Sequence, residues 1–197
     1  MAADPARKQA TYEDVLAAPP HVVAEVLFGV LYTHPRPAGP HAKAASILGM
    51  DLGGPFDRGR GGPGGWVVVY EPELHLGEDI VVPDLAGWRR ERLADVPSAA
   101  YITVAPDWIC EVLSRSTQAL DRTEKMAIYA REGVRHAWLV DPIARTLEVY
   151  RLQATEWLRI GTWRDAALVR AEPFDAIELE LGALWIREPA PELAQER

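Results

Sequence analysis

The sequence predicts a mixed α/β or α+β fold in which a central mixed β-sheet is flanked by helices. Strand-like and helix-like segments follow one another in mixed order along the chain. In addition, residues 108–113 form an apolar run in which both alternating faces are apolar except at Glu111, as expected for a central strand covered on both sides. The length of 197 residues favours one domain, expected over residues 11–187 between flexible tails at 1–10 and 188–197.

The first third of the chain predicts a short helix, a β-hairpin and a second helix. Thr11 with Asp14 resembles a helix start, and the Pro19-Pro20 pair ends that helix. The expected elements are a helix at 12–17, strands at 21–28 and 30–33 around Gly29, and a helix at 41–52. Residues 53–65 hold seven glycines in thirteen residues but lack the Gly-Lys-Ser/Thr ending of a phosphate-binding loop, so a flexible loop is expected there.

The remainder of the chain predicts mostly strands, with one helix among them. Pro83 has no N–H donor, so Asp84 is expected at a point where the strand ladder is interrupted. Asp121 with Glu124 resembles a capping box, which predicts a helix over 122–132 that ends at Gly133. The expected strands are 66–70, 73–76, 80–82, 85–88, 108–113, 136–141, 147–152, 157–163 and 176–181.

Composition restricts the class of protein. The net charge of −8 counts against a protein that coats nucleic acid non-specifically, but not against a nuclease whose acidic cleft recruits a divalent metal. The single cysteine, Cys110, excludes an internal disulfide and a multi-cysteine zinc site, and its place in a strand favours a packing role. The five histidines show no metal-ligand spacing. Without an apolar run of membrane-spanning length or a signal peptide, the protein is expected to be cytoplasmic.

Two carboxylates and a lysine are the candidate functional residues. Asp84 and Glu111 lie in runs expected to be buried, where an unpaired carboxylate is costly unless it is paired or holds a metal. Lys125 is one of only three lysines beside 18 arginines, and its expected place in the first turns of a helix opposes the helix dipole. Together they suggest a metal-assisted hydrolytic site. Two plainer interpretations of Lys125 stay open, namely a solvated lysine and an i, i+4 pair with Asp121.

Several motifs occur in the order found in a known family. They are Glu25 near Gly29, His41 at a helix start, Val82-Pro83-Asp84, Glu111-Val112-Leu113-Ser114, Asp121 to Lys125 with Tyr129 and Gly133-Val134, and Trp138-Leu139-Val140-Asp141-Pro142. In this the chain resembles the Uma-two family, restriction-endonuclease-like proteins within the PD-(D/E)XK nuclease superfamily. The resemblance covers roughly residues 12–187 and is most specific between Glu111 and Pro142.

The resemblance implies a restriction-endonuclease-like core and assigns roles to residues. Asp84 would be the motif aspartate and Glu111 the motif glutamate, with Glu25 as an additional acid. The superfamily's usual lysine lies two residues after the glutamate, where this chain has Leu113, so Lys125 resembles a lysine that has migrated to the next helix. Glu25 has a strong competing interpretation as a solvent-facing strand residue.

The implied activity is that of a Mg²⁺-dependent endodeoxyribonuclease. Asp84, Glu111 and the backbone carbonyl of Val112 would offer oxygen ligands to Mg²⁺ or Mn²⁺, and Lys125 would position water or stabilise charge on the phosphate. The expected substrate is nucleic acid, with DNA favoured over RNA. A homodimer is expected because cleavage of both strands of a duplex suits two-fold symmetry.

Two alternatives to an active nuclease stay open. The chain could be a catalytically silent, nuclease-shaped binding module, which Leu113 and the acidic net charge favour and the retained carboxylates disfavour. The acids could also be structural, satisfied by backbone donors and arginines.

Overall fold

The structure, a computed structural model, describes residues 9–35 and 39–186. The expected tails at 1–10 and 188–197 lie outside these ranges, except for Gln9 and Ala10. The Ala10 N–H donates to the Gly29 carbonyl at 2.9 Å. Within the described ranges, no helix has both the length and the apolar character that crossing a bilayer requires.

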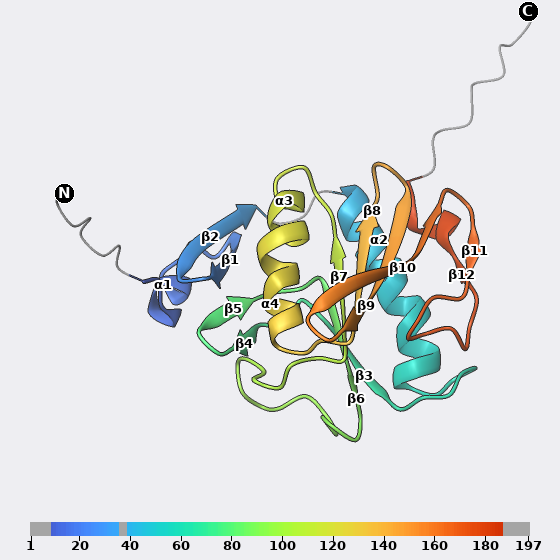
Figure 1. Ribbon diagram of the computed structural model, residues 1–197, viewed down its shortest axis with the longest axis horizontal. Helices are drawn as coiled ribbons and strands as arrows, with labels where there is room; N and C mark the ends of the chain where they lie inside the picture. Colours follow the sequence, from blue (N-terminus) through green and yellow to red (C-terminus); the bar gives the residue numbers. More distant parts are fainter. Residues whose placement is uncertain (1–8, 36–38, 187–197) are drawn as a thin grey trace, which may run out of the picture.

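A six-stranded mixed sheet forms the centre of the molecule (Figure 1). Its strand order is β10-β9-β8-β7-β6-β3, and only β7 and β8 run parallel to each other. The strands are β3 (Trp66–Tyr70), β6 (Leu85–Arg89), β7 (Trp108–Val112), β8 (His136–Asp141), β9 (Thr146–Gln153) and β10 (Glu156–Arg164). The predicted central mixed sheet is therefore confirmed, and the predicted strand at 108–113 lies inside it.

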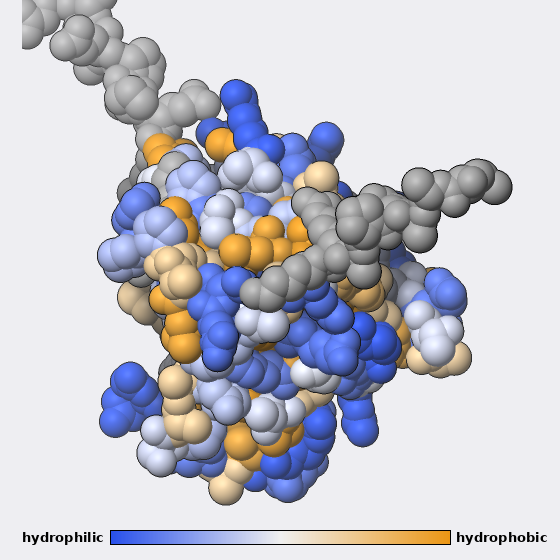
Figure 2. Space-filling view, turned by 90° about the vertical axis from the view of Figure 1, so that its left-hand side faces the viewer, coloured by the Kyte–Doolittle hydropathy of each residue, from blue (hydrophilic) through white to orange (hydrophobic). Residues whose placement is uncertain are grey.

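A second, four-stranded sheet carries the N-terminal hairpin. Its order is β2-β1-β5-β4, with β1 (Val22–Leu27), β2 (Val30–Pro35), β4 (Leu74–Leu76) and β5 (Asp79–Val81). Phe28 and Gly29 connect β1 to β2, both at positive φ (50° and 74°), as a two-residue hairpin turn requires. Figure 2 shows this side of the molecule, where apolar residues are interspersed with polar ones. A short pair, β11 (Leu168–Val169) and β12 (Leu179–Glu180), replaces the longer strand expected at 176–181.

Helices cover both faces of the six-stranded sheet. The short α1 (Tyr12–Leu16) precedes the hairpin, while α2 (Gly39–Leu52) packs on one face of the sheet. On the opposite face lies a continuous helical segment made of α3 (Gln118–Leu120), η2 (Asp121–Lys125) and α4 (Met126–Arg131), as Figure 1 shows. A last turn, η3 (Leu181–Leu184), follows β12.

The two faces of β7 enter two different cores, as its alternating pattern predicted. Trp108, Cys110 and Val112 pack in a cluster with residues of α2 and the C-terminal segment. Ile109 and Leu113 pack in a second cluster with α4. A strand covered on both sides holds its polar residues away from water, which sets the conditions around Glu111.

The predicted start of the second major helix was wrong. The helix begins at Gln118 and not near Arg122, and the Gln118 N–H bonds to the Ser114 carbonyl at 3.0 Å. Asp121 is therefore not a cap but a buried residue inside the helix, 4% exposed. Lys125 also lies beyond the first turns, so the argument from the helix dipole does not apply to it.

The glycine-rich segment was also predicted incorrectly at its start. Residues Gly53–Asp57 form a helical turn, η1, that continues α2, and Phe56 within it is buried. The ring of Phe56 packs on Phe174, with 4.6 Å between centroids. This core contact accounts for a helical turn that the glycine content argues against.

Phe174 ties the C-terminal segment to the sheet. Its ring is fully buried and contacts Trp66 and Trp108, each at 4.8 Å between centroids, and Trp138 at 5.7 Å. These aromatic contacts join β3, β7 and β8 from one side.

Phe174→Ala should lower the free energy of unfolding by about 3–5 kcal/mol, because it leaves a cavity among large rings that cannot close in. Phe28→Ala is the matched control, since Phe28 is 54% exposed, and it should cost less than about 1 kcal/mol. Urea unfolding followed by tryptophan fluorescence measures both. Equal losses in the two variants would contradict the role given to Phe174.

Candidate active site

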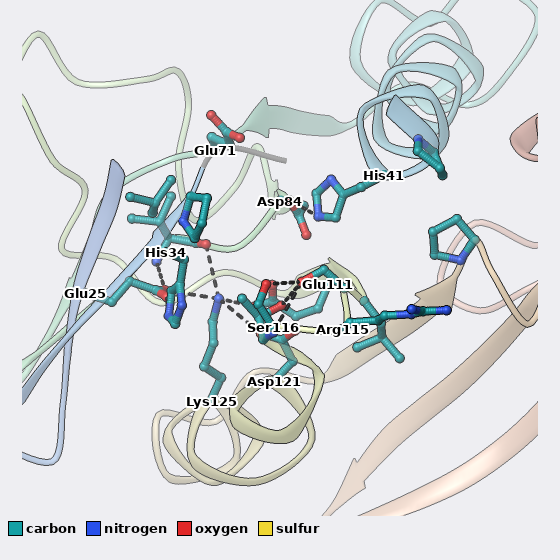
Figure 3. A pocket seen from close by; sticks show the side chains of 18 of the residues that line it. Glu25, His34, His41, Glu71, Asp84, Glu111, Arg115, Ser116, Asp121 and Lys125 are labelled. Carbon is teal, nitrogen blue, oxygen red and sulfur yellow. Dashed lines mark hydrogen bonds and ion pairs between the residues drawn. The ribbon is translucent and has the colours of Figure 1, made fainter. Parts of the chain in front are cut away.

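A pocket of about 440 Å³ opens where the two sheets and the helical segment meet (Figure 3). All four of the predicted catalytic side chains line it: Glu25, Asp84, Glu111 and Lys125. Its other walls come from the hairpin, the start of α2, the loop after β7 and the turn after β8, and include His34, His41, Leu113, Ser114, Arg115, Asp121, Pro142 and Ile143. Because β7 and β8 are parallel, their carboxyl ends lie at the same edge of the sheet, and the pocket is at that edge.

Each candidate side chain comes from a different part of the fold. Glu25 lies on β1, Asp84 in the interruption between β5 and β6, and Glu111 near the end of β7. Lys125 comes from the helical segment that follows. The structure thus brings together residues that are up to 100 positions apart in the sequence.

The Lys125 ammonium is the centre of the polar network. Its Nζ lies 3.0 Å from Glu25 Oε1 and 3.0 Å from Glu111 Oε1, and it donates to the Val82 carbonyl at 3.2 Å. The residue is 3% exposed, so the interpretation as a solvated lysine was wrong. The i, i+4 contact with Asp121 exists but is longer, at 3.9 Å. Burial lowers the pKa of Lys125, but the carboxylates of Glu111 and Glu25 outweigh burial and raise it well above its usual value.

Glu111 is 2% exposed and has a second donor besides the lysine. The Tyr129 hydroxyl donates to Glu111 Oε1 at 2.6 Å. Burial raises the pKa of Glu111 well above its usual value, Lys125 works in the opposite direction, and Asp121, Asp84 and Glu25 add to the increase. A negative charge on Glu111 is therefore unfavourable in free energy because it is buried, and Lys125 offsets this only partly.

Asp84 is contacted from two elements, by one hydrogen bond and one ion-pair contact. The Val112 N–H donates to Asp84 Oδ2 at 2.7 Å, and His41 Nε2 lies 3.1 Å from Asp84 Oδ1. The Asp84 side chain is 13% exposed, more than those of Glu25 and Glu111. Val112 thus reaches the site through its backbone, while its side chain packs in the core on the other face of the sheet.

Glu25 is buried at 3% exposure, so the interpretation as a solvent-facing residue was wrong. Its Oε1 accepts the Val82 N–H at 2.7 Å in addition to contacting Lys125. His34 Nε2 lies 3.7 Å from Glu25 Oε2. Glu25 therefore fixes the lysine and the strand that precedes Asp84.

Sequence reasoning gave no role in this network to three residues, His34, His41 and Tyr129, although His41 and Tyr129 belong to the motifs of the family resemblance. The hairpin register pairs Val23 with His34 and Glu25 with Tyr32, so a two-residue turn at Phe28-Gly29 already implies that His34 lies diagonally across from Glu25. Tyr129 is fully buried, and a buried tyrosine needs a partner for its hydroxyl, which Glu111 provides. For the contact between His41 and Asp84, no local signal exists.

The oxygen ligands predicted for a metal are only partly assembled. Among residues 9–35 and 39–186, no group of three or more His, Cys, Asp or Glu side chains is arranged to hold a metal ion. The predicted metal-ligand set needs only two such side chains, those of Asp84 and Glu111, together with the backbone carbonyl of Val112. Its donors are hard oxygens. Five carboxyl groups line the pocket, with Lys125 among them, and they belong to Glu25, Glu71, Asp84, Glu111 and Asp121. This donor set and excess of acids fit a divalent cation.

Comparison with known proteins identifies the family. Residues 10–183 match the Uma2 (Uma-two) family, described as "Putative restriction endonuclease". The chain belongs to this family. A comparison with curated protein sequences finds no match.

A solved structure shares the fold of this Uma2 protein. It is the crystal structure of "a putative nuclease belonging to DUF820" from Anabaena variabilis ATCC 29413, with a TM-score of 0.72 and 24% sequence identity. The match covers 89% of this chain and 97% of the other. The nuclease-like fold expected from the resemblance is therefore confirmed.

Lys125→Met should destabilise the protein by about 3–5 kcal/mol at neutral pH, because it leaves Glu25 and Glu111 buried without a cation. The deficit should shrink as the pH is lowered and Glu111, whose pKa is raised by burial, takes up a proton. Lys43→Met is the control, since Lys43 only donates to the Trp185 carbonyl, and about 1 kcal/mol is expected. Denaturant unfolding at several pH values measures both, and a deficit independent of pH would contradict this explanation.

Asp121→Asn should stabilise the protein relative to wild type as the pH rises. Burial raises the pKa of Asp121 from 3.8 to about 6, so the folded state binds this proton more tightly than the unfolded state. The wild type therefore loses stability between about pH 4 and pH 6, by at most ~3 kcal/mol from this group, whereas asparagine does not titrate. Urea unfolding in EDTA at pH 4, 5, 6 and 7 measures the difference between the two proteins. A difference that stays constant across this range would show that Asp121 does not titrate as expected.

Proposed function

We propose that this protein is a metal-dependent endonuclease that hydrolyses phosphodiester bonds of nucleic acid, with DNA as the expected substrate. One observation carries the proposal. Asp84, Glu111 and Lys125 come from three separate elements and line one pocket, with the lysine in contact with Glu111. Membership of the Uma2 family and the nuclease-like fold support the same reaction class.

Asp84 and Glu111, with the carbonyl of Val112, are the residues proposed to hold Mg²⁺ or Mn²⁺. A bound divalent cation supplies Lewis acidity toward the phosphate and lowers the pKa of a coordinated water. Asp84 is suited to this because, among the described residues, each of its oxygens has one short polar contact, which leaves lone pairs for a ligand bond. Glu111 is suited because a cation would relieve the cost of its buried charge.

Lys125 is proposed to stabilise negative charge that develops on the phosphate. The three nearest acceptors of its ammonium group are Glu25, Glu111 and the Val82 carbonyl, which hold it in one position. A preorganised cation of this kind costs no rearrangement at the moment of reaction. Glu25 is proposed as the residue that orients the lysine and keeps it protonated.

The proposal also includes the oligomeric state. We infer a homodimer, because cleavage of both strands of a duplex suits two sites related by a two-fold axis.

Nicking of supercoiled plasmid in Mg²⁺ or Mn²⁺ tests the proposal. Wild type should nick only with metal, and Glu111→Gln should reduce the rate by at least ~100-fold, because it removes a charged metal ligand without changing its size. Lys125→Arg should also be impaired, since a guanidinium cannot reproduce a compact point charge among these acceptors. Glu156→Gln, an exposed glutamate on β10, is the matched control and should cut like wild type.

Two results would overturn the proposal. Nicking that survives in Glu111→Gln would come from another site or from a contaminant. Absence of cleavage of duplex, single-stranded DNA and RNA by a folded wild-type protein would instead favour the catalytically silent binding module.

A further inference from the structure

His41 lies in the first turn of α2 and faces the pocket wall beside Asp84 (Figure 3). It is 8% exposed, and its Nε2 lies 3.1 Å from Asp84 Oδ1. This is the distance of an ion pair. A carboxylate oxygen only accepts hydrogen bonds, so the contact is favourable when the facing nitrogen, Nε2, carries the ring proton.

The other ring nitrogen of His41 has no partner among the described residues. Nδ1 is buried and makes no hydrogen bond, and only Trp108 Nε1 shares this condition in the described part of the chain. A buried polar atom without a partner is destabilising, so this ring orientation is not explained by the stability of the fold. The one polar contact that the ring makes is the contact with Asp84.

Asp84 is contacted at both oxygens by groups of different origin. The Val112 N–H comes from β7 and donates to Oδ2, whereas His41 comes from α2 and its Nε2 faces Oδ1 at ion-pair distance. Contacts on both oxygens restrict the orientation of a carboxylate. The His34 ring is not equivalent, since its Nε2 lies 3.7 Å from Glu25, beyond hydrogen-bond distance.

We infer that His41 is a positioning residue that holds the Asp84 carboxylate in the orientation needed to bind a divalent cation. The inference rests on the proposed function, because it concerns a ligand of the proposed metal. Donors behind a metal ligand usually affect metal affinity and activity by 10–100-fold. His41 itself is not proposed to touch the metal or the substrate.

Glutamine and asparagine at position 41 separate the hydrogen bond from packing. The amide nitrogen of glutamine reaches about as far as His Nε2, while that of asparagine reaches only as far as Nδ1. The measurement is the Mn²⁺ concentration that produces half of the metal-induced rise in melting temperature. For His41→Gln this concentration should stay within about 3-fold of wild type. His41→Asn should raise that concentration by about 10–100-fold. In plasmid cleavage at fixed Mn²⁺, His41→Asn should lower kcat with little change in KM for DNA.

His136→Asn is the matched control. His136 is partly buried and lies 3.5 Å from a carboxylate oxygen of Glu172, but it does not line the pocket. It should leave the Mn²⁺ midpoint unchanged. Equal midpoints for His41→Gln, His41→Asn and wild type would overturn the inference, and so would equal losses in the two position-41 variants, because packing alone would then explain them.

A readout without metal keeps the two proposals separate. Long-range ¹H–¹⁵N spectra of wild type in EDTA should show a proton on His41 Nε2, and Asp84→Ala should shift that resonance. A ring protonated only at Nδ1 would overturn the inference even if His41→Asn fails to fold. If the spectra agree and metal-dependent cleavage occurs, but His41→Asn binds Mn²⁺ like wild type, only this inference fails. If wild type neither binds Mn²⁺ nor cleaves, the proposed function fails and the metal role of His41 fails with it.

Discussion

The ion pairs of Lys125 are the interaction on which the rest of the site depends. Burying Glu25 and Glu111 to 3% and 2% exposure requires compensation, and the ammonium group supplies it at 3.0 Å from each. The same lysine donates to the Val82 carbonyl, two residues before Asp84. The hairpin, the interrupted strand and the end of β7 are thus joined by one side chain from the helix, and the pocket exists because they are joined.

The compensation is incomplete, and that has a chemical consequence. Five carboxyl groups line the pocket, and burial raises the pKa of both Glu111 and Asp121. If the network served stability alone, the protein would be more stable with fewer acids, because a buried ion pair seldom stabilises a fold more than apolar residues of similar volume do. An excess of buried carboxylates is instead what a cation site needs. This contrast favours a functional explanation over the alternative of acids retained for structure.

The sequence allowed the acids to be identified but not their full surroundings. Asp84 and Glu111 stood out because each is a charge within an otherwise apolar strand run, which is a local signal. Lys125 was selected partly for a wrong reason, since the helix begins at Gln118 and the dipole argument fails. The contact of His41 with Asp84 spans 43 positions and depends on how α2 packs on the sheet, so no pattern in either segment predicts it. Likewise, Phe56 forms a helical turn in a glycine-rich segment because of a tertiary contact.

The position of the lysine also links the site to the core. Leu113, two residues after Glu111, is 2% exposed and packs with Ile128 and Tyr129 of α4. The ammonium instead comes from the turn just before those residues, and Tyr129 also donates to Glu111. The helix that fills the space beside Leu113 is therefore the helix that delivers the cation. The position of the Lys125 ammonium depends on how this helix packs in the core, so changes in that packing reach the site directly.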